Sequence, residues 1–377
     1  MSHGRLAVLI SFSGEGGVER MVLNLVEGFA ALERPVDLLT IRGDSAHLQA
    51  LPPSVRRVDL GVRHSTTAVL PLHRYLRRER PAALLVAKDR AIRAAALARH
   101  LAGSSSGGGN RPSTRLIGRL GTNLSAALAG RSGLARQLRL APMRWIYPLV
   151  DHVVAVSAGV AEDTLRVTGL PPARVSVVRN PVITPRLPRL AAEPLDHPWL
   201  AAGEPPVVLG AGRLTEQKDF STLLRAFAQL RASRRARLVI LGEGRLRGRL
   251  QTLARELGVA EDLALPGFVA NPYPWMQRAA VFALSSAWEG SPNVLTEAMA
   301  LGTPVAATDC PSGPREVLAD GRYGPLVPVG DWAALATGIV QALEQPVPAA
   351  DLRAAVADYS QEASARRYLQ LLDGGPD

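Results

Sequence analysis

Short apolar segments alternate with amphipathic stretches along the first half of the chain. The first apolar run spans residues 5–11, and a stretch with helical periodicity follows at residues 18–32. Runs of this kind are typical of strands buried in a parallel sheet. Further strands are predicted at residues 36–41, 82–87, 115–118, 151–157 and 174–179. Strands that alternate with helices indicate an α/β fold with a doubly wound sheet.

The same alternation restarts after residues 181–206, which contain seven prolines and favour a linker. Strands are then predicted at residues 205–210, 236–242, 280–285 and 304–308, and helices at residues 220–232, 245–257 and 293–301. We expect a Rossmann-like domain over residues 1–185, a linker over 186–204 and a second Rossmann-like domain over 205–358. A last segment, residues 359–377, is expected to be helical and to pack back on the first domain. Two such domains turn the carboxyl ends of their strands toward a central cleft.

Length and composition fit a two-domain globular chain. The 377 residues are too many for one ordinary core, and 47% of them are hydrophobic against 20% charged. The single cysteine, Cys310, excludes an internal disulfide framework and suits a reducing compartment. Neither a signal-type N-terminus nor a run of about 18 apolar residues occurs. We therefore expect a cytoplasmic protein that does not cross a membrane.

Positive charge is concentrated in the first half. Residues 1–185 hold 25 Lys and Arg against 12 Asp and Glu, whereas residues 186–377 hold 19 against 21. This asymmetry indicates a polyanionic partner. An anionic membrane surface fits better than nucleic acid, because only 5% of residues are aromatic and no nucleic-acid motif occurs. The alternative is a compositional bias, since all but two of the 44 basic residues are Arg.

One segment of the first half, residues 131–150, mixes basic and apolar residues. It contains Arg131, Arg136, Arg139 and Arg144 beside Leu134, Leu138, Trp145 and Tyr147. Cations next to interfacial aromatics suit a surface that lies on lipid. An ordinary amphipathic helix with its apolar face in the core is an equal alternative. A second basic cluster, residues 74–80, fits the same expected surface.

The candidate chemistry is densest at a predicted strand-to-helix corner near residue 289. Glu289 lies in the corner, Gly290 allows a tight turn, and Ser291 and Pro292 suit the cap and first turn of the next helix. Glu297 follows one to two turns later. Unpaired N–H groups at a helix start attract phosphate, while carboxylates accept hydrogen bonds from hydroxyls. The corner suits a sugar joined to a nucleoside diphosphate. The alternative is a pair of surface carboxylates.

A second candidate cluster follows the first strand of the second half. Gly212 lets the backbone approach a ligand, and Arg213 and Lys218 supply two cations. Two cations can neutralise a diphosphate without a metal. Lys218 is one of only two lysines, the other being Lys88, which favours a specific use of the compact ammonium group. The alternative is a solvated loop pair.

Other chemistry-bearing patterns are weak. Gly14, Gly16 and Gly17 form only part of a dinucleotide-binding fingerprint, and no P-loop sequence occurs. The glycine loop is a candidate to contact a diphosphate or an acceptor. The seven histidines show no metal-ligand spacing, and nothing around Cys310 marks a nucleophile. We expect neither a metal nor a resident cofactor.

Taken together, the motifs of the second half resemble a known enzyme family. Gly212-Arg213…Lys218, Gly242-Glu243-Gly244 and Glu289-x7-Glu297 are similar to the retaining glycosyltransferases of family 4, which have the GT-B fold. The stretch from residue 273 to residue 316 resembles bacterial members that build surface polysaccharides on lipid carriers. The resemblance is dense over residues 205–330 and thinner before them, where residues 14–17 and 156–159 match.

The resemblance implies a role for each matching position. Arg213 and Lys218 would hold the donor diphosphate, Glu289 would contact hydroxyls of the donor sugar, and Glu297 would contact the ribose. The other implied donor-binding residues are Gly16, Gly17, Gly212, Glu243, Val269, Gly290, Ser291, Pro292, Asn293 and Val294. Of these, Val269 belongs to a segment, residues 267–269, that would frame the nucleobase. Front-face attack, with the departing phosphate taking the acceptor proton, would retain the anomeric configuration without a metal.

The chain departs from this family pattern at one place in the first domain. Many members have a His near the sugar, in the loop after the strand predicted at residues 115–118. Residues 118–125 contain no His here, and Arg119 and Asn123 are the acceptor-side or sugar-side candidates instead.

The overall prediction is a retaining, metal-independent glycosyltransferase, peripheral on the inner face of the cell membrane. It would transfer a hexose or N-acetylhexosamine from a nucleotide diphosphate sugar, in the first place a UDP-sugar, to a lipid-linked glycan. The product would be surface polysaccharide or lipopolysaccharide. Two alternatives are a UDP-sugar isomerase or epimerase on the same fold and a non-catalytic subunit that binds sugar nucleotide. A dehydrogenase is disfavoured by the incomplete fingerprint.

Overall fold

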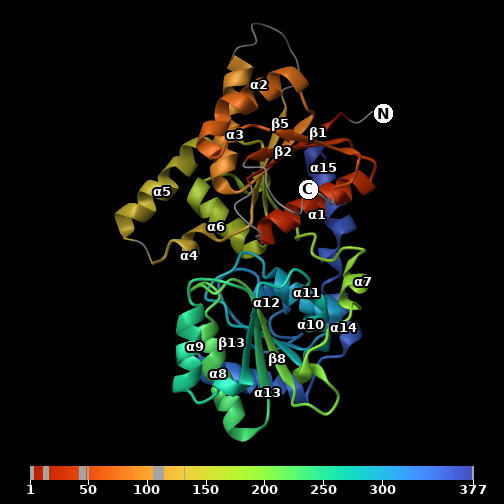
Figure 1. Cartoon of the computed structure of the whole chain (residues 1–377). Coiled ribbons are helices and arrows are strands. Elements are labelled where there is room, and N and C mark those ends of the chain that lie inside the picture. The colour runs from red at the N-terminus through yellow and green to blue at the C-terminus, as the bar shows by residue number, and fades with distance from the viewer. Residues whose placement is uncertain are drawn as a thin grey trace. The chain divides into compact units, whose positions relative to one another are not determined.

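The chain forms two compact units (Figure 1). The computed structural model describes residues 4–11, 17–41, 48, 51–104, 114–130 and 132–375. Unit 1 consists of Met1–Val182 and Ser360–Asp377, and unit 2 consists of Ile183–Tyr359. The C-terminal segment therefore belongs with the N-terminal half of the sequence.

The described part of unit 1 contains a seven-stranded parallel sheet in the order β3-β2-β1-β4-β5-β6-β7. Its strands are β1 (Leu6–Ser11), β2 (Val36–Ile41), β3 (Val55–Asp59), β4 (Ala83–Ala87), β5 (Arg115–Leu120), β6 (His152–Ala155) and β7 (Val175–Val177). The direction of strand order reverses between β1 and β4, and ligands of such sheets bind at the carboxyl ends of the strands beside this switch point. The sequence did not predict β3, because exposed Arg56 and Arg57 interrupt its apolar pattern.

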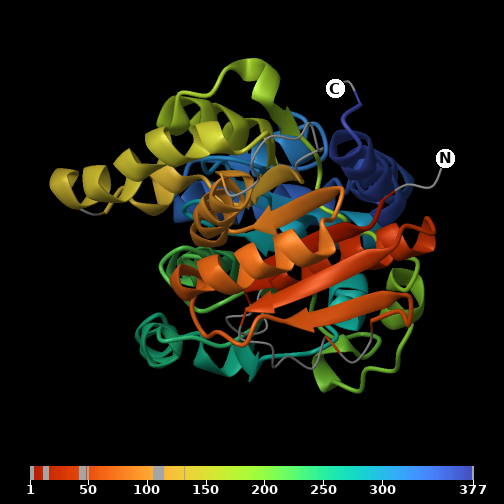
Figure 2. The ribbon, with the colours of Figure 1, turned by 90° about the horizontal axis from the view of Figure 1, so that it is seen from above.

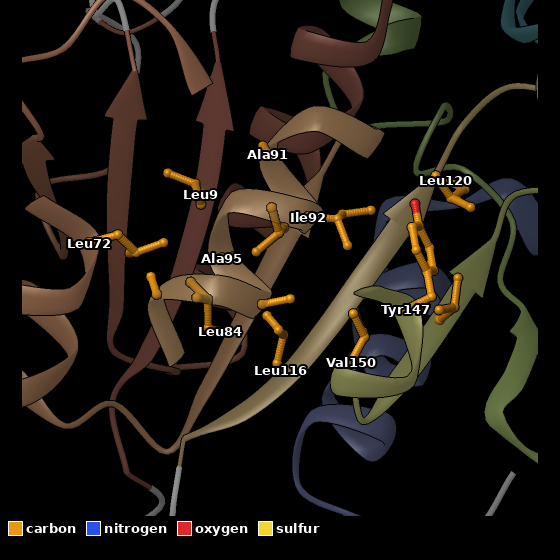
Figure 3. Close-up of a cluster of buried hydrophobic side chains, with 14 of the residues drawn as sticks. Leu9, Leu72, Leu84, Ala91, Ile92, Ala95, Leu116, Leu120, Tyr147 and Val150 are labelled. Atoms are coloured by element: carbon orange, nitrogen blue, oxygen red, sulfur yellow. The ribbon is translucent and has the colours of Figure 1, made fainter. Parts of the chain in front are cut away.

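Helices cover both faces of this sheet (Figure 2). They are α1 (Gly17–Ala31), α2 (Val69–Glu79), α3 (Asp89–Ser104), α4 (Leu124–Ala127), α5 (Gly133–Ile146), α6 (Ala158–Thr168) and α15 (Gln361–Leu372). On one face Leu84 and Leu116 of the sheet pack beneath Ile92 and Ala95 of α3 (Figure 3). Alternate strand residues point to the other face, where they pack against α1 and α15.

The last helix, α15, is fixed to α1 and to the chain after β7 by hydrogen bonds, and to α1 also by close packing. The amide nitrogen of Gln361 donates a 2.7 Å hydrogen bond to the carbonyl of Asn24, and the Ser364 hydroxyl donates to the carbonyl of Arg179 at 2.9 Å. A Cβ atom at Gly28 would lie 2.9 Å from the Cβ of Ala365, so only glycine allows this approach. The chain returns to unit 1 through this helix.

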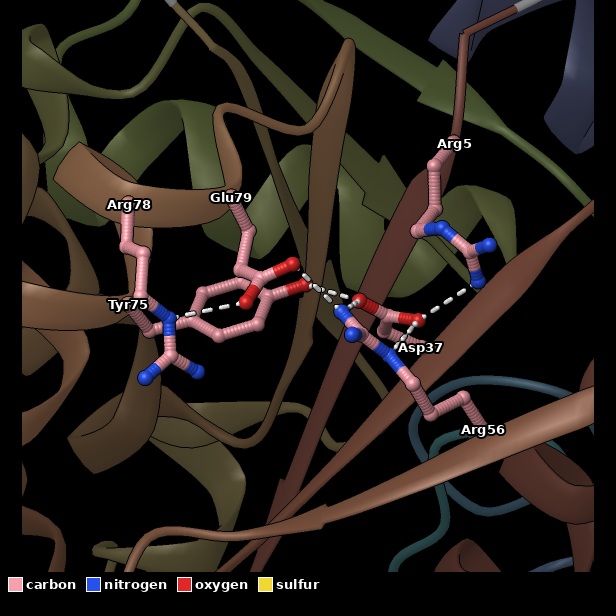
Figure 4. A network of polar contacts seen from close by, with 6 residues as sticks. All are labelled: Arg5, Asp37, Arg56, Tyr75, Arg78 and Glu79. Carbon is pink, nitrogen blue, oxygen red and sulfur yellow. Dashed lines mark hydrogen bonds and ion pairs between the residues drawn. The ribbon is translucent and has the colours of Figure 1, made fainter.

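A buried carboxylate, Asp37, joins the amino ends of β2 and β3 to the carboxyl-terminal half of α2 in unit 1. Asp37 on β2 is fully buried and accepts hydrogen bonds from Arg5 at 2.9 Å, from Tyr75 at 2.6 Å and from Arg56 (Figure 4). Burial alone would raise the pKa of Asp37, but the hydrogen bonds from Arg56, Tyr75 and Arg5 outweigh it and hold this pKa below its usual value. Arg56 also pairs with Glu79 at 2.7 Å. The network ties β2, β3 and α2 together.

This network predicts a specific loss of stability in acid. Because the folded-state pKa of Asp37 is lowered, its stabilisation is complete above the unfolded-state pKa of about 3.9 and is lost as the pH falls through the folded-state value. We expect Asp37→Asn to lower the unfolding free energy by more than about 1 kcal/mol at neutral pH, and by less at pH values below about 3. Urea unfolding followed across pH measures both quantities. The exposed carboxylate variant Asp351→Asn is the control, and equal pH profiles for the two variants would contradict the assignment.

The described part of unit 2 contains a six-stranded sheet in the order β10-β9-β8-β11-β12-β13. Its strands are β8 (Val207–Ala211), β9 (Arg237–Leu241), β10 (Leu263–Gly267), β11 (Val281–Leu284), β12 (Val305–Thr308) and β13 (Leu326–Val327). Its helices are α7 (Leu187–Ala191), α8 (Phe220–Ser233), α9 (Arg247–Glu256), α10 (Tyr273–Arg278), α11 (Asn293–Leu301), α12 (Pro314–Val317), α13 (Trp332–Glu344) and α14 (Ala349–Ala355). The switch point lies between β8 and β11.

The proline-rich stretch differs from the predicted linker, because residues 186–204 are part of unit 2. Pro188 lies in the first turn of the short helix α7, where its missing N–H group is tolerated. Asn271 donates hydrogen bonds to the carbonyl of Leu190 at 2.8 Å and to the carboxylate of Glu193 at 2.7 Å. Pro188 and Pro198 thus start short helical turns that belong to the second unit. Within the described ranges, no helix is both long and apolar enough to span a bilayer.

Candidate functional site

Two loops of unit 2 are joined at the carboxyl edge of its sheet, directly at the switch point. One loop follows β8 and the other follows β11. The amide of Ala287 donates to the carbonyl of Gln217 at 2.8 Å, and the Gln217 side chain donates to the carbonyl of Trp288 at 3.1 Å. The hydroxyl of Ser285 donates to the carbonyl of Lys218 at 2.8 Å. These bonds hold side chains distant in sequence in one fixed arrangement.

The two loops bring Lys218 and Glu289 into direct contact. The ammonium group of Lys218 lies 2.5 Å from the carboxylate of Glu289, and the two side chains are only 15% and 7% exposed. The hydroxyl of Ser286 donates to the same carboxylate oxygen at 2.7 Å. Removal from water strengthens the electrostatic field of such groups. The sequence predicted Lys218 and Glu289 as site residues but gave no role to Ser286, which fixes the carboxylate.

Glycines make room for this arrangement. Gly212 has φ +153°, and a Cβ atom there would lie 3.0 Å from Cε of Lys218, so the lysine stem lies against bare backbone. Gly242 has φ +132°, and a Cβ atom there would lie 2.0 Å from the carbonyl oxygen of Gly212. No side chain fits at Gly242 unless the backbone moves. The loops after β8 and β9 therefore depend on glycine for their packing.

Helix α11 starts at this edge, immediately after Glu289 and Gly290. Its N-cap residue is Pro292, and no side chain caps the helix, so the prediction that Ser291 acts as the cap is wrong. The Ser291 backbone carbonyl instead accepts a hydrogen bond from the amide of Asn293 at 3.0 Å. Asn293 and Val294 form the first turn and are half-buried. The dipole at the start of a helix favours an anion.

Glu297 lies deeper in the same helix. Its side chain is fully buried and accepts a hydrogen bond from the hydroxyl of Tyr273 on α10 at 3.4 Å. The sequence did not assign Tyr273 a role. The role of Glu297 toward a ribose stays a prediction.

The remaining predicted residues of unit 2 are more exposed. Arg213 is exposed, and its guanidinium makes no hydrogen bond or ion pair with the part of the chain that the structure describes. Glu243 pairs with Arg247 at 2.8 Å, and a Cβ atom at Gly267 would lie 2.8 Å from the Glu243 carboxylate. Val269 follows Gly267 and is half-buried. The structure thus places Glu243 beside the segment that the resemblance assigns to the nucleobase.

The predicted residues of unit 1 have structural partners. Arg119 is only 2% exposed, and its guanidinium donates to the side-chain oxygen of Asn180 at 2.6 Å. Asn123 caps α4 by accepting a hydrogen bond from the amide of Ala126 at 3.0 Å. Gly17 is the first residue of α1, whereas Gly16 lies outside the described residues. The role of Arg119 and Asn123 toward a sugar stays a prediction.

Lys88 is a further residue at a switch point, and its role could not be assigned from the sequence. It follows β4 with an unusual φ of +74°, and its ammonium group contacts the carboxylate of Glu19 at 2.7 Å and the carbonyl of Ser11 at 2.7 Å. Each of the two lysines of the chain therefore lies at the carboxyl edge of a sheet, paired with a glutamate. The signal that could have found Lys88 is the rarity of lysine in this arginine-rich sequence.

Cys310 lies near the Lys218–Glu289 pair and is buried. Burial raises the pKa of the Cys310 thiol, and the negative charge of Glu289 raises it further. A protonated thiol is a poor nucleophile, so Cys310 fits the packing role expected from the sequence. Among the described residues, no group of three or more His, Cys, Asp or Glu side chains is placed to hold a metal ion.

Comparisons with known families cover nearly the whole chain. Residues 193–363 match the family described as Glycosyl transferases group 1, and residues 15–186 match the family described as Glycosyltransferase Family 4.

Individual relatives agree with these families. The chain is 34% identical over 199 residues to N-acetylgalactosamine-N,N'-diacetylbacillosaminyl-diphospho-undecaprenol 4-alpha-N-acetylgalactosaminyltransferase of Campylobacter jejuni, covering 53% of this chain and 52% of the relative. It is 35% identical over 236 residues to the lipopolysaccharide core biosynthesis glycosyltransferase LpsE of Rhizobium meliloti, covering 60% of this chain and 65% of the relative. The matches thus span between about half and two thirds of these relatives.

Solved structures match over almost their full length. Anabaena HepE in complex with UDP and glucose superposes with a TM-score of 0.77 at 18% identity, covering 98% of this chain and 99% of that one. The lipopolysaccharide outer core galactosyltransferase WaaB superposes with a TM-score of 0.70 at 20% identity, covering 97% and 98%. At this level of identity the superpositions establish the fold.

Proposed function

Because the chain belongs to glycosyltransferase family 4 and has the GT-B fold, we propose that it transfers a hexose or N-acetylhexosamine from a UDP-sugar to a lipid-linked glycan. The product is surface polysaccharide or lipopolysaccharide, made at the inner face of the cell membrane. The reaction retains the anomeric configuration and uses no metal.

The observation that carries this proposal is the Lys218–Glu289 pair at the switch point of unit 2. A buried ammonium group, the exposed guanidinium of Arg213 and the uncapped start of α11 supply positive charge without a metal. Glu289 accepts hydrogen bonds on one oxygen from Lys218 and Ser286, and its carboxylate also suits sugar hydroxyls. The cluster combines the two chemistries that a nucleotide sugar requires.

In the proposed reaction a hydroxyl oxygen of the acceptor forms a bond to the anomeric carbon of the donor sugar. The bond between this carbon and the β-phosphate oxygen breaks, and the electron pair stays on UDP. The acceptor proton passes to the departing phosphate on the same face of the sugar. Lys218 and Arg213 stabilise the charge that grows on the diphosphate, which lowers the barrier.

The named relatives support the donor and acceptor classes. The Campylobacter relative is named for transfer to a diphospho-undecaprenol-linked sugar, and the Rhizobium relative for lipopolysaccharide core biosynthesis. The Anabaena structure holds UDP and glucose. These names favour a nucleotide sugar and a lipid-linked glycan as the two substrates of this chain.

A thermal-shift screen of UDP-, GDP- and ADP-sugars tests the donor. A ligand present at about 100 times its Kd stabilises the folded state by about 2.7 kcal/mol, which raises the Tm by several degrees. We expect a UDP-sugar to give the largest shift, with the shift unchanged by EDTA. A preference for GDP- or ADP-sugars, or a shift that requires a divalent metal, would contradict this part of the proposal.

Product analysis then separates the alternatives. The proposed enzyme releases UDP and a product with retained configuration when the preferred donor is mixed with lipid-linked glycans. Conversion of the UDP-sugar to another UDP-sugar without acceptor would identify an isomerase or epimerase. Donor binding without transfer to any glycan or hydrolysis would identify a non-catalytic subunit.

A further inference from the structure

Helix α5 of unit 1 turns apolar side chains to solvent. Leu134 and Leu138 are each 69% exposed and Trp145 is 81% exposed, although buried positions are usual for such residues. The structure describes all of α5, and Met143 is its only buried residue. Figures 1 and 2 show α5, in yellow, extending away from the sheet of unit 1.

The exposed apolar residues lie on one side of the helix. Residues 134, 138, 141 and 145 are spaced by four, three and four positions, which places them in a single stripe along a helix of 3.6 residues per turn. Met143 lies on the opposite side and faces the core. The alternative from the sequence, in which the apolar face of this segment packs into the core, is therefore wrong for this stripe.

Arg144 of α5 lies next to the stripe, whereas Arg136, seven positions before Met143, lies on the other side of the helix. Acidic side chains are absent from the surrounding sequence. Residues 90–150 contain ten Arg and no Asp or Glu. Arg136 and Arg144 of α5 are exposed and form no ion pair with any described residue. They line a groove of about 470 Å³ together with Arg166 of α6, above an apolar floor that includes Leu140 and Val167. The groove combines cations with an apolar surface.

We propose that α5 docks unit 1 on an anionic phospholipid bilayer. Leu134, Leu138 and Trp145 enter the interface between headgroups and acyl chains. Arg144, next to them, contacts lipid phosphates, and Arg136 reaches the headgroups from the groove. This arrangement is that of a helix lying in the plane of the interface, with long basic side chains reaching the headgroups. The inference deepens the proposed function, on which it rests for its biological purpose, by naming the surface that meets the membrane.

Charge complementarity favours a bilayer over a protein partner. The stripe is narrow and lies next to Arg144, on a basic segment without carboxylates, which matches a surface of uniform negative charge. Protein interfaces instead have charged residues depleted at their centre and satisfied in pairs. A second copy of this chain would bring the same cations together and repel.

Vesicle binding tests this surface directly. We expect the full chain to sediment with vesicles of phosphatidylcholine and phosphatidylglycerol at low ionic strength, but not with vesicles of phosphatidylcholine alone, and to be released by salt. Brominated lipid should quench Trp145, because the other four tryptophans lie in unit 2. Leu138→Glu, and separately the pair Arg136→Ala and Arg144→Ala, should each weaken vesicle binding at least tenfold.

Matched controls keep the test specific. Leu70→Glu on α2 changes a leucine of unit 1 that is 55% exposed, and the pair Arg235→Ala and Arg249→Ala removes two exposed charges from unit 2. Both controls should bind vesicles as the unchanged protein does. Undiminished binding by Leu138→Glu would overturn the proposal. The proposal would also be overturned if Leu138→Glu abolished self-association of the chain and left vesicle binding unchanged.

The same variants separate this inference from the proposed function. Leu138→Glu should keep the thermal shift with UDP-sugar, because α5 belongs to unit 1 and the Lys218–Glu289 pair to unit 2. Specific vesicle binding by a chain that transfers no sugar would support the docking surface and refute the proposed function. Sugar transfer by a chain that never binds anionic vesicles would support the proposed function and refute the docking surface.

Discussion

Replacing Lys218 with methionine is expected to lower the rate of sugar transfer about 100-fold, because the departing diphosphate loses a preorganised buried cation. Methionine keeps an unbranched stem against Gly212, so the packing of the loop is largely preserved. Steady-state kinetics with the preferred UDP-sugar measure the change. Since the proposed cation acts most strongly as the bond breaks, kcat should fall more than the affinity for the donor.

The substitution also leaves Glu289 buried beside an apolar side chain, which by itself destabilises the fold by up to about 3 kcal/mol. The double variant Lys218→Met with Glu289→Gln removes both charges. We expect it to recover most of the lost melting temperature and none of the lost activity. Near-normal transfer by the folded double variant would exclude both residues from the chemistry.

Replacing Gly242 with alanine is expected to lower the unfolding free energy of unit 2 by more than about 3 kcal/mol. The new Cβ atom would lie 2.0 Å from the carbonyl oxygen of Gly212, and the backbone at this position has φ +132°. The loops after β8 and β9 would have to separate. Because Gly212 supports the stem of Lys218, binding of the UDP-sugar should be lost as well.

Gly248→Ala provides the matched control for this prediction. Gly248 lies in α9, and a Cβ atom there would meet nothing within 4 Å. This variant should be neutral or more stable by about 0.5–1 kcal/mol, because alanine favours a helix. Urea unfolding and the thermal shift with UDP-sugar compare the two variants. Equal stability of the two alanine variants would show that the loop contact between Gly212 and Gly242 is not tight.

The sequence predicts the buried strands well and the edges of the sheets poorly. The bounds of β2 and α11 agree with the apolar pattern, because β2 is fully buried and α11 is mostly buried. By contrast, β3, β10 and β13 were not predicted. Strand β10 has mostly half-buried residues and a proline, and β13 has only two residues. Such strands are defined by pairing with a neighbour, which a local pattern does not contain.

The candidate site, like the sheets, was predicted from the sequence only in part. Lys218 and Glu289 were predicted from their residue types and from their positions after strands. In a parallel sheet, such positions lie at the same carboxyl edge. The direct contact of Lys218 with Glu289 could not be predicted, because it depends on how two loops 71 residues apart pack. The hydrogen bond from Ser286, three residues before Glu289, depends on how the loop after β11 turns. Arg119 had the right residue type for a sugar contact, yet its burial beside Asn180 depends on the packing of unit 1.

The sequence by itself determined the α/β class and the family, and it predicted the residue types of the candidate site, because short apolar strands and spaced motifs are local patterns. Only the tertiary structure decided which partner each of these residues has. It also decided that α5 exposes Leu134, Leu138 and Trp145, a choice that periodicity leaves open. A helical stripe shows that one face is apolar, but whether core or solvent meets that face is set by contacts with distant elements.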